Sequence, residues 1–211
     1  MKSSGIERLV FSSSAATYGQ ATSDLITEDS LAAPTNPYGQ TKLEIDQMIG
    51  GSGLSAISLR YFNVAGALKT SRDWVSERHA TETHLIPNVL KASSDAPLKI
   101  FGTDWDTPDG TCVRDYVHVV DLIDAHILAL EKLTSHHEII NIGSGVGNSV
   151  REVISASEKV LGRKISTADA PRRDGDPARL VASIEKAKKI LGWVPTRDLI
   201  AMIEDHHAAQ G

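Results

Sequence analysis

The run Leu9-Val10-Phe11-Ser12-Ser13-Ser14 is a short apolar segment that ends in three serines. Its length and residue types are typical of a buried strand. A helix that begins at Pro37 and continues through Ile49 is expected next, and residues 56–61 are typical of a second strand. Strand, helix and strand in this order predict a βαβ unit and therefore a parallel sheet.

Tyr38 and Lys42 lie four residues apart on the predicted helix, which places both side chains on one helix face. A lysine ammonium in that position lowers the pKa of the tyrosine, so that the phenol can act as a base near neutral pH. Ser14 lies at the C-terminal end of the first strand, at the edge of a parallel sheet where ligands bind, and its hydroxyl can relay a proton. A Tyr-x-x-x-Lys pair alone is common on solvated helix faces, but together with Ser14 it indicates redox chemistry on a secondary alcohol.

The remainder of the chain has a looser pattern with longer loops. The run Ser149-Val150-Arg151-Glu152 is a capping box, which predicts a helix that begins there and closes at Gly162. Apolar spacing predicts further helices over residues 85–92, 120–133, 183–191 and 199–206, and short strands over residues 98–101, 113–116 and 139–142. A strict βαβ part is therefore followed by a mixed α+β part.

Composition and charge narrow the class of protein. The 211 residues carry a formal net charge of -5, which argues against a dedicated nucleic-acid binder, because such proteins usually have a basic face. Cys112 is the single cysteine, so no internal disulfide is expected, as in a reducing compartment. The apolar run near the start is too short for a signal peptide or a spanning helix. We therefore expect a cytoplasmic protein with no membrane or nucleic-acid partner.

Several residues of types that often bind ligands are assigned no such role. The run Gly143-Ser144-Gly145-Val146-Gly147 resembles a dinucleotide-binding loop, but no acidic residue follows at the required distance within another βαβ unit. We expect a tight turn there instead. The pairs His136-His137 and His206-His207 are expected near helix ends, where adjacent side chains diverge, so no metal site is predicted. Cys112 is expected to be a small buried residue.

A series of segments, in order along nearly the whole chain, resembles the extended short-chain dehydrogenase/reductase family that acts on nucleotide sugars. Within that family the segments are similar to those of the UDP-glucose (UDP-galactose) 4-epimerases. The most specific of them is Asp109-Gly110-Thr111-Cys112-Val113-Arg114-Asp115-Tyr116-Val117-His118-Val119. The others are residues 11–19, 36–42, 59–66, 84–87, 141–145, 172–177 and 191–193.

The resemblance favours an epimerase over other members of the family. The dehydratases carry carboxylates directly after the serine or threonine, where this chain has Ala15 and Ala16. Alanine neither donates nor accepts a proton, which leaves Tyr38 as the general base. The resemblance thus implies an isomerase of galactose and nucleotide-sugar metabolism. It would interconvert UDP-galactose and UDP-glucose through a 4-keto sugar with NAD as cofactor.

The resemblance also implies a role for each matched residue near the cofactor. Tyr38 would remove the proton of the 4-hydroxyl while hydride passes to NAD. Lys42 would hold the nicotinamide ribose and keep Tyr38 acidic. Ser14 would bridge Tyr38 and the substrate hydroxyl, and Phe62 would lie against the cofactor.

For the UDP-sugar the resemblance implies a second set of contacts. Arg114 and Arg173 would clamp the diphosphate, because guanidinium geometry matches phosphate oxygens. Asp176 would accept hydrogen bonds from ribose hydroxyls, and Lys99-Ile100-Phe101 would line the uracil site. The predicted substrate-binding residues are Asn63, His84, Leu85, Lys99, Ile100, Phe101, Arg114, Arg173 and Asp176.

Members of this family begin with a strand, a Gly-x-x-Gly-x-x-Gly turn and a helix that bind the pyrophosphate of NAD, and no such turn occurs in this sequence. We therefore expect an N-terminally truncated chain. Its predicted fold is α/β, with an incomplete Rossmann-type parallel sheet that lacks the first βαβ units and a smaller α+β substrate-binding portion. Residues 1–66 and 117–143 would be the NAD-binding remnant, and residues 67–116 and 144–211 the substrate portion. Such a chain is expected to bind NAD weakly or not at all.

Alternatives to an active epimerase stay open at this point. The first alternative is a non-catalytic UDP-sugar-binding half that needs a complementary N-terminal half. The second is a relic that does not fold stably. A third alternative is an epimerase for another UDP-sugar, such as an N-acetylated or pentose form. A homodimer is one further assembly that the resemblance allows.

Overall fold

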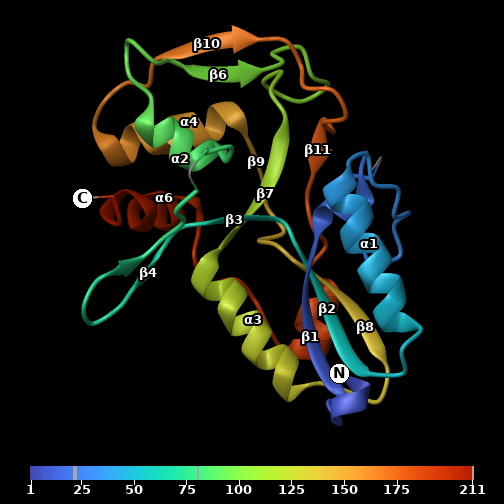
Figure 1. The fold of residues 1–211 in the computed structure, drawn as a ribbon. Coiled ribbons are helices and arrows are strands. Elements are labelled where there is room, and N and C mark those ends of the chain that lie inside the picture. The colour runs from blue at the N-terminus through green and yellow to red at the C-terminus, as the bar shows by residue number, and fades with distance from the viewer. Residues whose placement is uncertain (21–22, 80, 211) are drawn as a thin grey trace.

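The computed structural model of the chain describes residues 1–20, 23–79 and 81–210. The lower half of the molecule in Figure 1 contains a parallel sheet in the order β1–β2–β8. Its strands are β1 (Arg8–Ser14), β2 (Ser55–Tyr61) and β8 (His137–Ile142). The register pairs Ser14 with Tyr61, and Tyr61 with Ile142, so the carboxyl ends of the three strands meet at one edge.

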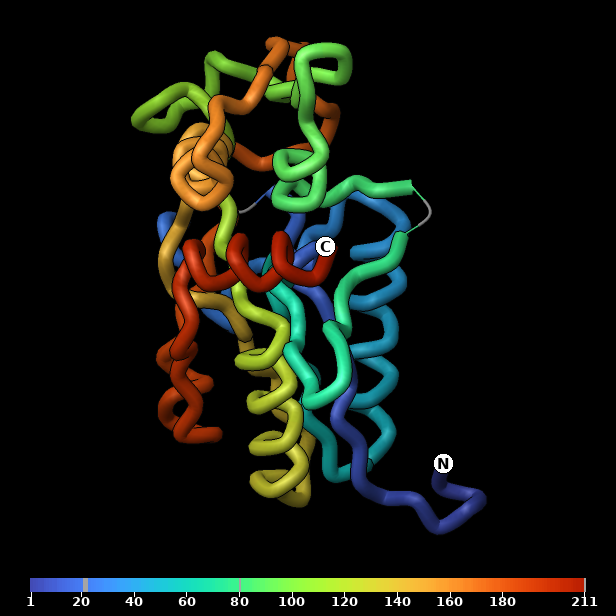
Figure 2. Tube along the Cα trace, turned by 90° about the vertical axis from the view of Figure 1, so that its left-hand side faces the viewer, coloured from blue at the N-terminus to red at the C-terminus, as the bar shows by residue number. Residues whose placement is uncertain are grey.

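Apolar side chains on both faces of this sheet explain why a helix covers each face. Phe11 of β1 packs against the buried cluster that contains Ile49 of α1 (Pro37–Gly50). The preceding residue of β1, Val10, packs against a different buried cluster, which contains Ala125 of α3 (Val119–Glu131). Successive residues of a strand point to opposite faces. Figure 2 accordingly shows α1 and α3 on opposite sides of the strands.

The upper half of the molecule is built from shorter strands and from helices that enclose a second apolar core around Val89, Ile100 and Val153. β6 (Leu98–Phe101) pairs with β10 (Thr167–Ala170). β7 (Val113–His118) lies between β3 (Asn63–Ala65) and β11 (Arg179–Leu180), and it also pairs with β9 (Gly147–Ser149). The helices of this half are α2 (Leu85–Lys91), α4 (Val150–Leu161) and α6 (Leu199–Ala208).

The remaining elements are short. They are the 3₁₀ turns η1 (Lys2–Ser4) and η2 (Ala15–Tyr18), the antiparallel pair β4 (Leu68–Lys69) and β5 (Trp74–Val75), and α5 (Glu185–Leu191). In the part of the chain that the structure describes, no helix is long and apolar enough to cross a membrane.

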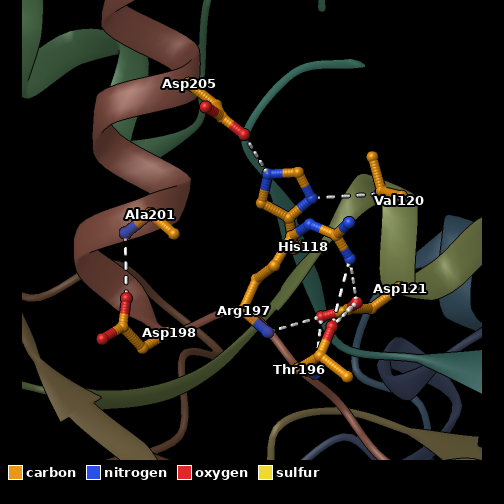
Figure 3. Close-up of polar contacts among 8 residues, drawn as sticks. All are labelled: His118, Val120, Asp121, Thr196, Arg197, Asp198, Ala201 and Asp205. Carbon is orange, nitrogen blue, oxygen red and sulfur yellow. Dashed lines mark hydrogen bonds and ion pairs between the residues drawn. The ribbon is translucent and has the colours of Figure 1, made fainter. Parts of the chain in front are cut away.

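β7 connects the two halves, because α3 begins directly after its last residue, His118. The imidazole of His118 is fully buried and its Nδ1 accepts a hydrogen bond from the Val120 amide at 3.1 Å, which caps α3. Nε2 therefore carries the proton and donates to Asp205 of α6 at 3.1 Å (Figure 3). Burial of the ring lowers the pKa of His118, which favours this neutral form.

Asp121, in the first turn of α3, fixes the segment that leads into α6 (Figure 3). Its carboxylate, 2% exposed, accepts hydrogen bonds from the amides of Thr196 and Arg197 and from the Thr196 hydroxyl, at 2.8 to 3.1 Å. The Arg197 guanidinium also donates to it. The Asp121 carbonyl accepts from the indole of buried Trp193 at 2.8 Å. A buried anion is stable only with such partners, so this one residue holds the C-terminal segment on α3.

The expected α/β class, with a parallel sheet and a smaller mixed portion, is confirmed. The capping box is present, since Ser149 accepts from the Glu152 amide at 3.0 Å and Glu152 accepts from the Ser149 amide at 2.7 Å. Gly162 ends that helix with a φ of 63°.

Some expectations from the sequence need correction. His137 lies in β8 and not near a helix end, because backbone pairing with β2 continues back to His137, opposite Ala56. Ser14, by contrast, is the last residue of β1, as expected from the sequence. Cys112 is half-buried, because it borders a cavity described below.

We expect Asp121→Asn to lower the free energy of unfolding by about 2–3 kcal/mol, because an amide leaves at least one buried donor without an acceptor. Urea denaturation followed by circular dichroism measures this change. Asp124→Asn, on the exposed face of the same helix, is the matched control and is expected to change stability by about 0.5 kcal/mol or less. Equal midpoints for the two variants would contradict the role given to Asp121.

Candidate active site

A cleft opens at the carboxyl ends of β1 and β2, where Ser14 and Tyr61 border a cavity of about 770 Å³. A neighbouring cavity of about 580 Å³ extends into the upper half. Asn63, His84 and Arg114 border both cavities, so the two adjoin along one cleft. Ligands of open parallel sheets bind at this edge, and both volumes are typical of small-molecule sites.

Tyr38 reaches the larger cavity from the first turn of α1. The side chain of Asn36 caps the helix by accepting from the Gly39 amide at 2.8 Å, and Pro37 is the first helical residue. The helix lies so close to η2 that a Cβ on Gly39 would be 2.3 Å from the carbonyl oxygen of Ala16. Glycine at position 39 therefore permits the approach that puts Tyr38, which is 54% exposed, over the end of β1.

Lys42 lies one turn further along α1 and shares the face of Tyr38. Its ammonium is 5.6 Å from the centroid of the Tyr38 ring and 4.9 Å from that of Phe11. It donates a hydrogen bond to the carbonyl of Ser12 at 2.8 Å. Lys42 is thus held against β1 beneath Tyr38, and its side chain does not border either cavity.

Ser14, 9% exposed, borders the larger cavity and also has a structural role. Its hydroxyl oxygen accepts from the Ala16 amide at 3.1 Å and so caps η2. Tyr61, at the end of the adjacent strand, borders the same cavity. Burial raises the pKa of the Tyr61 phenol, and proximity to Tyr38 raises it further. Tyr61 is therefore a neutral phenol at physiological pH.

The smaller cavity has the charge of an anion-binding site. The cationic side chains of Lys91, Lys99, Arg114 and Arg173 border it, against the single carboxylate of Asp176. The Arg114 guanidinium lies 3.9 Å from Asp176. A concave surface with an excess of one charge concentrates ligands of the opposite charge.

Aromatic side chains supply the apolar part of the smaller cavity. The Arg173 guanidinium lies over the ring of Phe101, 3.8 Å from its centroid, which orients the cation toward the cleft wall. Tyr116 borders the cavity at 5% exposure, and burial raises the pKa of its phenol far above the usual range. A flat aromatic face beside fixed cations suits a ligand that joins a planar ring to phosphate groups.

Most of the site residues expected from the sequence border this cleft. They are Ser14, Tyr38, Phe62, Asn63, His84, Leu85, Lys99, Phe101, Arg114, Arg173 and Asp176. Lys42 does not, as described above, and Ile100 does not either. Ile100 is 2% exposed and lies in the apolar core, because it alternates along β6 with Lys99 and Phe101.

Several residues that border the cleft were not predicted as site residues from the sequence. Tyr61 is one of them, although it directly precedes the expected Phe62 at the end of a predicted strand, which was a usable signal. Glu77 and His79 border the larger cavity from the loop after β5. That loop has no periodicity from which its position can be inferred.

Comparison with known families gives one match over most of the chain. Residues 1–143 match the NAD dependent epimerase/dehydratase family. The match includes β1, α1 and β2, and so contains Ser14, Tyr38 and Lys42.

Individual relatives and solved structures agree with this match. The chain is 51% identical to a UDP-glucose 4-epimerase of Corynebacterium glutamicum, over 97% of this chain and 64% of the relative. A solved UDP-glucose-4-epimerase from Stenotrophomonas maltophila, with bound NAD and formylated UDP-arabinopyranose, superposes with a TM-score of 0.91 at 35% identity. A UDP-glucose 4-epimerase from Bifidobacterium longum, in complex with NAD+ and UDP, superposes with a TM-score of 0.88 at 36% identity. Both structures are covered to 65%, and this chain to 100%. The chain thus spans less than two thirds of the length of these relatives.

We expect Gly39→Ala to destabilise the chain by about 1–3 kcal/mol, because the added methyl group meets backbone atoms that cannot move aside without shifting α1. Gly51→Ala, at the other end of the same helix, is the control. Its Cβ would lie 3.7 Å from the nearest neighbour and its φ is -81°, so stability should change by about 0.5 kcal/mol or less. Thermal unfolding of both variants distinguishes the outcomes. A Gly39→Ala variant as stable as Gly51→Ala would show that the approach of α1 to η2 is not tight.

Proposed function

The chain belongs to the NAD dependent epimerase/dehydratase family, and from that premise we propose that it forms the catalytic and nucleotide-sugar-binding part of a UDP-glucose 4-epimerase. The observation that carries this proposal is that the two cavities adjoin along one cleft. Tyr38 and Ser14 border one end of it, and Arg114 and Arg173 border the cationic end. A ligand held by its phosphates at the cationic end can therefore extend toward the phenol of Tyr38.

The cationic end suits the UDP portion of the substrate. Arg114 and Arg173 would bind the diphosphate, and Phe101 with Lys99 would flank the uracil. Asp176, 3.9 Å from Arg114, would accept hydrogen bonds from the ribose. The length of cleft between this end and Tyr38 would hold the sugar, with Asn63 and the His84–Leu85 backbone beside it.

The larger cavity fits the nicotinamide end of NAD. Ser14, Tyr38 and Phe62 border it, and its volume of about 770 Å³ exceeds what the sugar alone requires. The chemistry that NAD supplies when bound is acceptance and return of hydride at carbon 4 of the sugar. The corresponding work of this chain is proton transfer, for which Tyr38 would take the proton of the 4-hydroxyl. The Lys42 ammonium, 5.6 Å from the centroid of the Tyr38 ring, would supply positive charge beside the phenol.

We further propose that residues 1–66 and 117–143 are the cofactor side of the site, and that residues 67–116 and 144–211 are the substrate side. Ile57 and Ile140 lie in one apolar core and Val89 and Val153 in the other, in agreement with this division. Ala182, Ala187 and Trp193 pack into the first core, so this stretch of the C-terminal segment lies with the cofactor side. On the cofactor side, Ser14, Tyr38 and Phe62 would contact NAD, and Lys42, which borders neither cavity, would act through Tyr38. For that reason we expect the 211-residue chain by itself to turn over slowly or not at all unless NAD is present in large excess.

A non-catalytic UDP-sugar-binding half is the second candidate. The cationic cavity favours this candidate, because the charged residues that border it all belong to this chain. UDP could therefore bind there without a bound cofactor. Such a half would need a complementary N-terminal half to become active. Binding without turnover in the assays below would support this candidate.

We expect Tyr38→Phe to lower the conversion of UDP-galactose to UDP-glucose by about 100-fold or more, measured with excess NAD, because phenylalanine has no group to take the proton. Binding of UDP-glucose should be unchanged, since the anion-binding residues are intact. Conversion by the variant at the rate of the original chain would overturn the assignment of the general base. If the original chain binds UDP-glucose and converts none, the binding-half candidate applies.

We expect Arg114→Met to weaken the binding of UDP by about tenfold or more, because one charge-assisted hydrogen bond to phosphate is lost while the length of the side chain is kept. Isothermal titration calorimetry of UDP measures the change. Arg72→Met, which removes an exposed arginine outside both cavities, is the matched control and should bind as the original chain does. An equal loss of UDP affinity in both variants would indicate a general effect of charge and would contradict a direct contact between Arg114 and the phosphates.

A further inference from the structure

The loop between β5 and α2 contains two Glu-x-His pairs, Glu77-Arg78-His79 and Glu82-Thr83-His84. Neither pair has a part in the proposed chemistry through its side chains. In an extended segment, residues i and i+2 point to the same side. Each pair can therefore present one carboxylate and one imidazole together.

The structure brings the two pairs to one point. One potential metal-binding atom from each of the four side chains lies within 4.8 Å of all the others. Oε1 of Glu77 is 2.6 Å from Nδ1 of His79 and 2.7 Å from Nδ1 of His84, and Oε1 of Glu82 is 3.0 Å from Nδ1 of His84. The centroids of the two imidazole rings lie 5.4 Å apart, and each ring turns its Nδ1 toward the carboxylates.

The charge and burial of these groups suit a cation. With neutral histidines, the two carboxylates give the cluster a charge that one divalent ion balances. Burial by itself would raise the pKa of Glu82, but hydrogen bonds from His84 and Thr83 outweigh it and lower the pKa, so this carboxylate is ionised at neutral pH. The side chains of Glu77 and Glu82 are 22% and 10% exposed, whereas those of His79 and His84 are 56% and 49% exposed. An ion can therefore enter from the solvent past the histidines.

We propose that Glu77, His79, Glu82 and His84 bind one divalent transition-metal ion, for which Zn²⁺ is the best match. Two imidazole nitrogens and two carboxylate oxygens form the mixed set of four donors that Zn²⁺ accepts in tetrahedral sites. Mg²⁺ and Ca²⁺ favour oxygen ligands alone and higher coordination numbers. On binding, each histidine exchanges its Nδ1–H···O hydrogen bond for an Nδ1–metal bond, and its proton moves to Nε2 or to solvent.

The location of this site links it to the cleft. His84 is the residue directly before α2 and borders both cavities, and Glu77 and His79 border the larger one. A bound ion would hold residues 77 and 79 against the start of α2 and so fix one wall of the cleft. The proposal does not depend on which ligand the cleft binds.

Titration of the full 211-residue chain, purified without a polyhistidine tag, tests the site. Calorimetry with ZnCl₂ at pH 7.5 should give saturable binding of one ion per chain, whereas MgCl₂ should give none. The absorption spectrum of the Co²⁺-loaded chain should show the intense visible bands of a four-coordinate site. Affinity for Zn²⁺ should fall as the pH is lowered, because protons compete with the metal for the imidazole nitrogens.

Variants make the result specific to these four residues. His79→Gln and Glu82→Gln should each weaken Zn²⁺ binding by about tenfold or more. His136→Gln is the control, because it removes a histidine from an exposed His136–Glu138 pair, 2.7 Å apart, elsewhere on the chain. Far-UV circular dichroism verifies that all three variants fold. Equal Zn²⁺ affinity for His79→Gln and His136→Gln, or binding of Mg²⁺ with similar strength, would overturn the proposal.

Discussion

The buried carboxylate of Asp115 is the constraint on which the arrangement of the cleft depends. Asp115 is 0% exposed and lies in the middle of β7, the strand that joins the two halves of the fold. It accepts hydrogen bonds from the amide and hydroxyl of Ser144 at 2.6 and 2.7 Å, from the Gly145 amide at 3.0 Å and from the Ala182 amide at 3.1 Å. Burial raises the pKa of this carboxyl, and the hydrogen bonds oppose that rise. One side chain therefore joins β7 to the turn after β8 and to the segment after β11, and so fixes the neighbouring Arg114 relative to the sheet.

The same interaction decides what the glycine-rich turn at residues 143–147 can do. In a phosphate-binding loop the backbone amides of such a turn are free to donate to the ligand. Here the amides of Ser144 and Gly145 already donate to Asp115. A Cβ on Gly143 would lie 2.4 Å from the Asp115 carboxylate, so this glycine is required by the close approach of the carboxylate. The turn is thus part of the scaffold, as the sequence predicted from the missing acidic residue.

Local signals in the sequence were reliable where a few neighbouring residues determine the structure. Pro37 and the capping box at Ser149 gave the starts of two helices, and the position of Ser14 after an apolar run indicated the edge at which the cleft opens. The errors arise where the outcome depends on partners far away in the chain. Alternation along β6 buries Ile100 between Lys99 and Phe101, and pairing with β2 draws His137 into a strand. Likewise, the convergence of the two Glu-x-His pairs depends on the path of a loop, which no periodicity encodes.

We propose that one cleft, made by the two adjoining cavities of this chain, holds a UDP-sugar with its phosphates at the cationic end and its sugar toward Tyr38. A crystal structure of the chain grown with UDP-glucose tests this claim most directly. We expect the uracil beside Phe101, the diphosphate at Arg114 and Arg173, and the 4-hydroxyl directed toward the phenol of Tyr38. A ligand bound outside this cleft, or one with its sugar directed away from Tyr38, would contradict it.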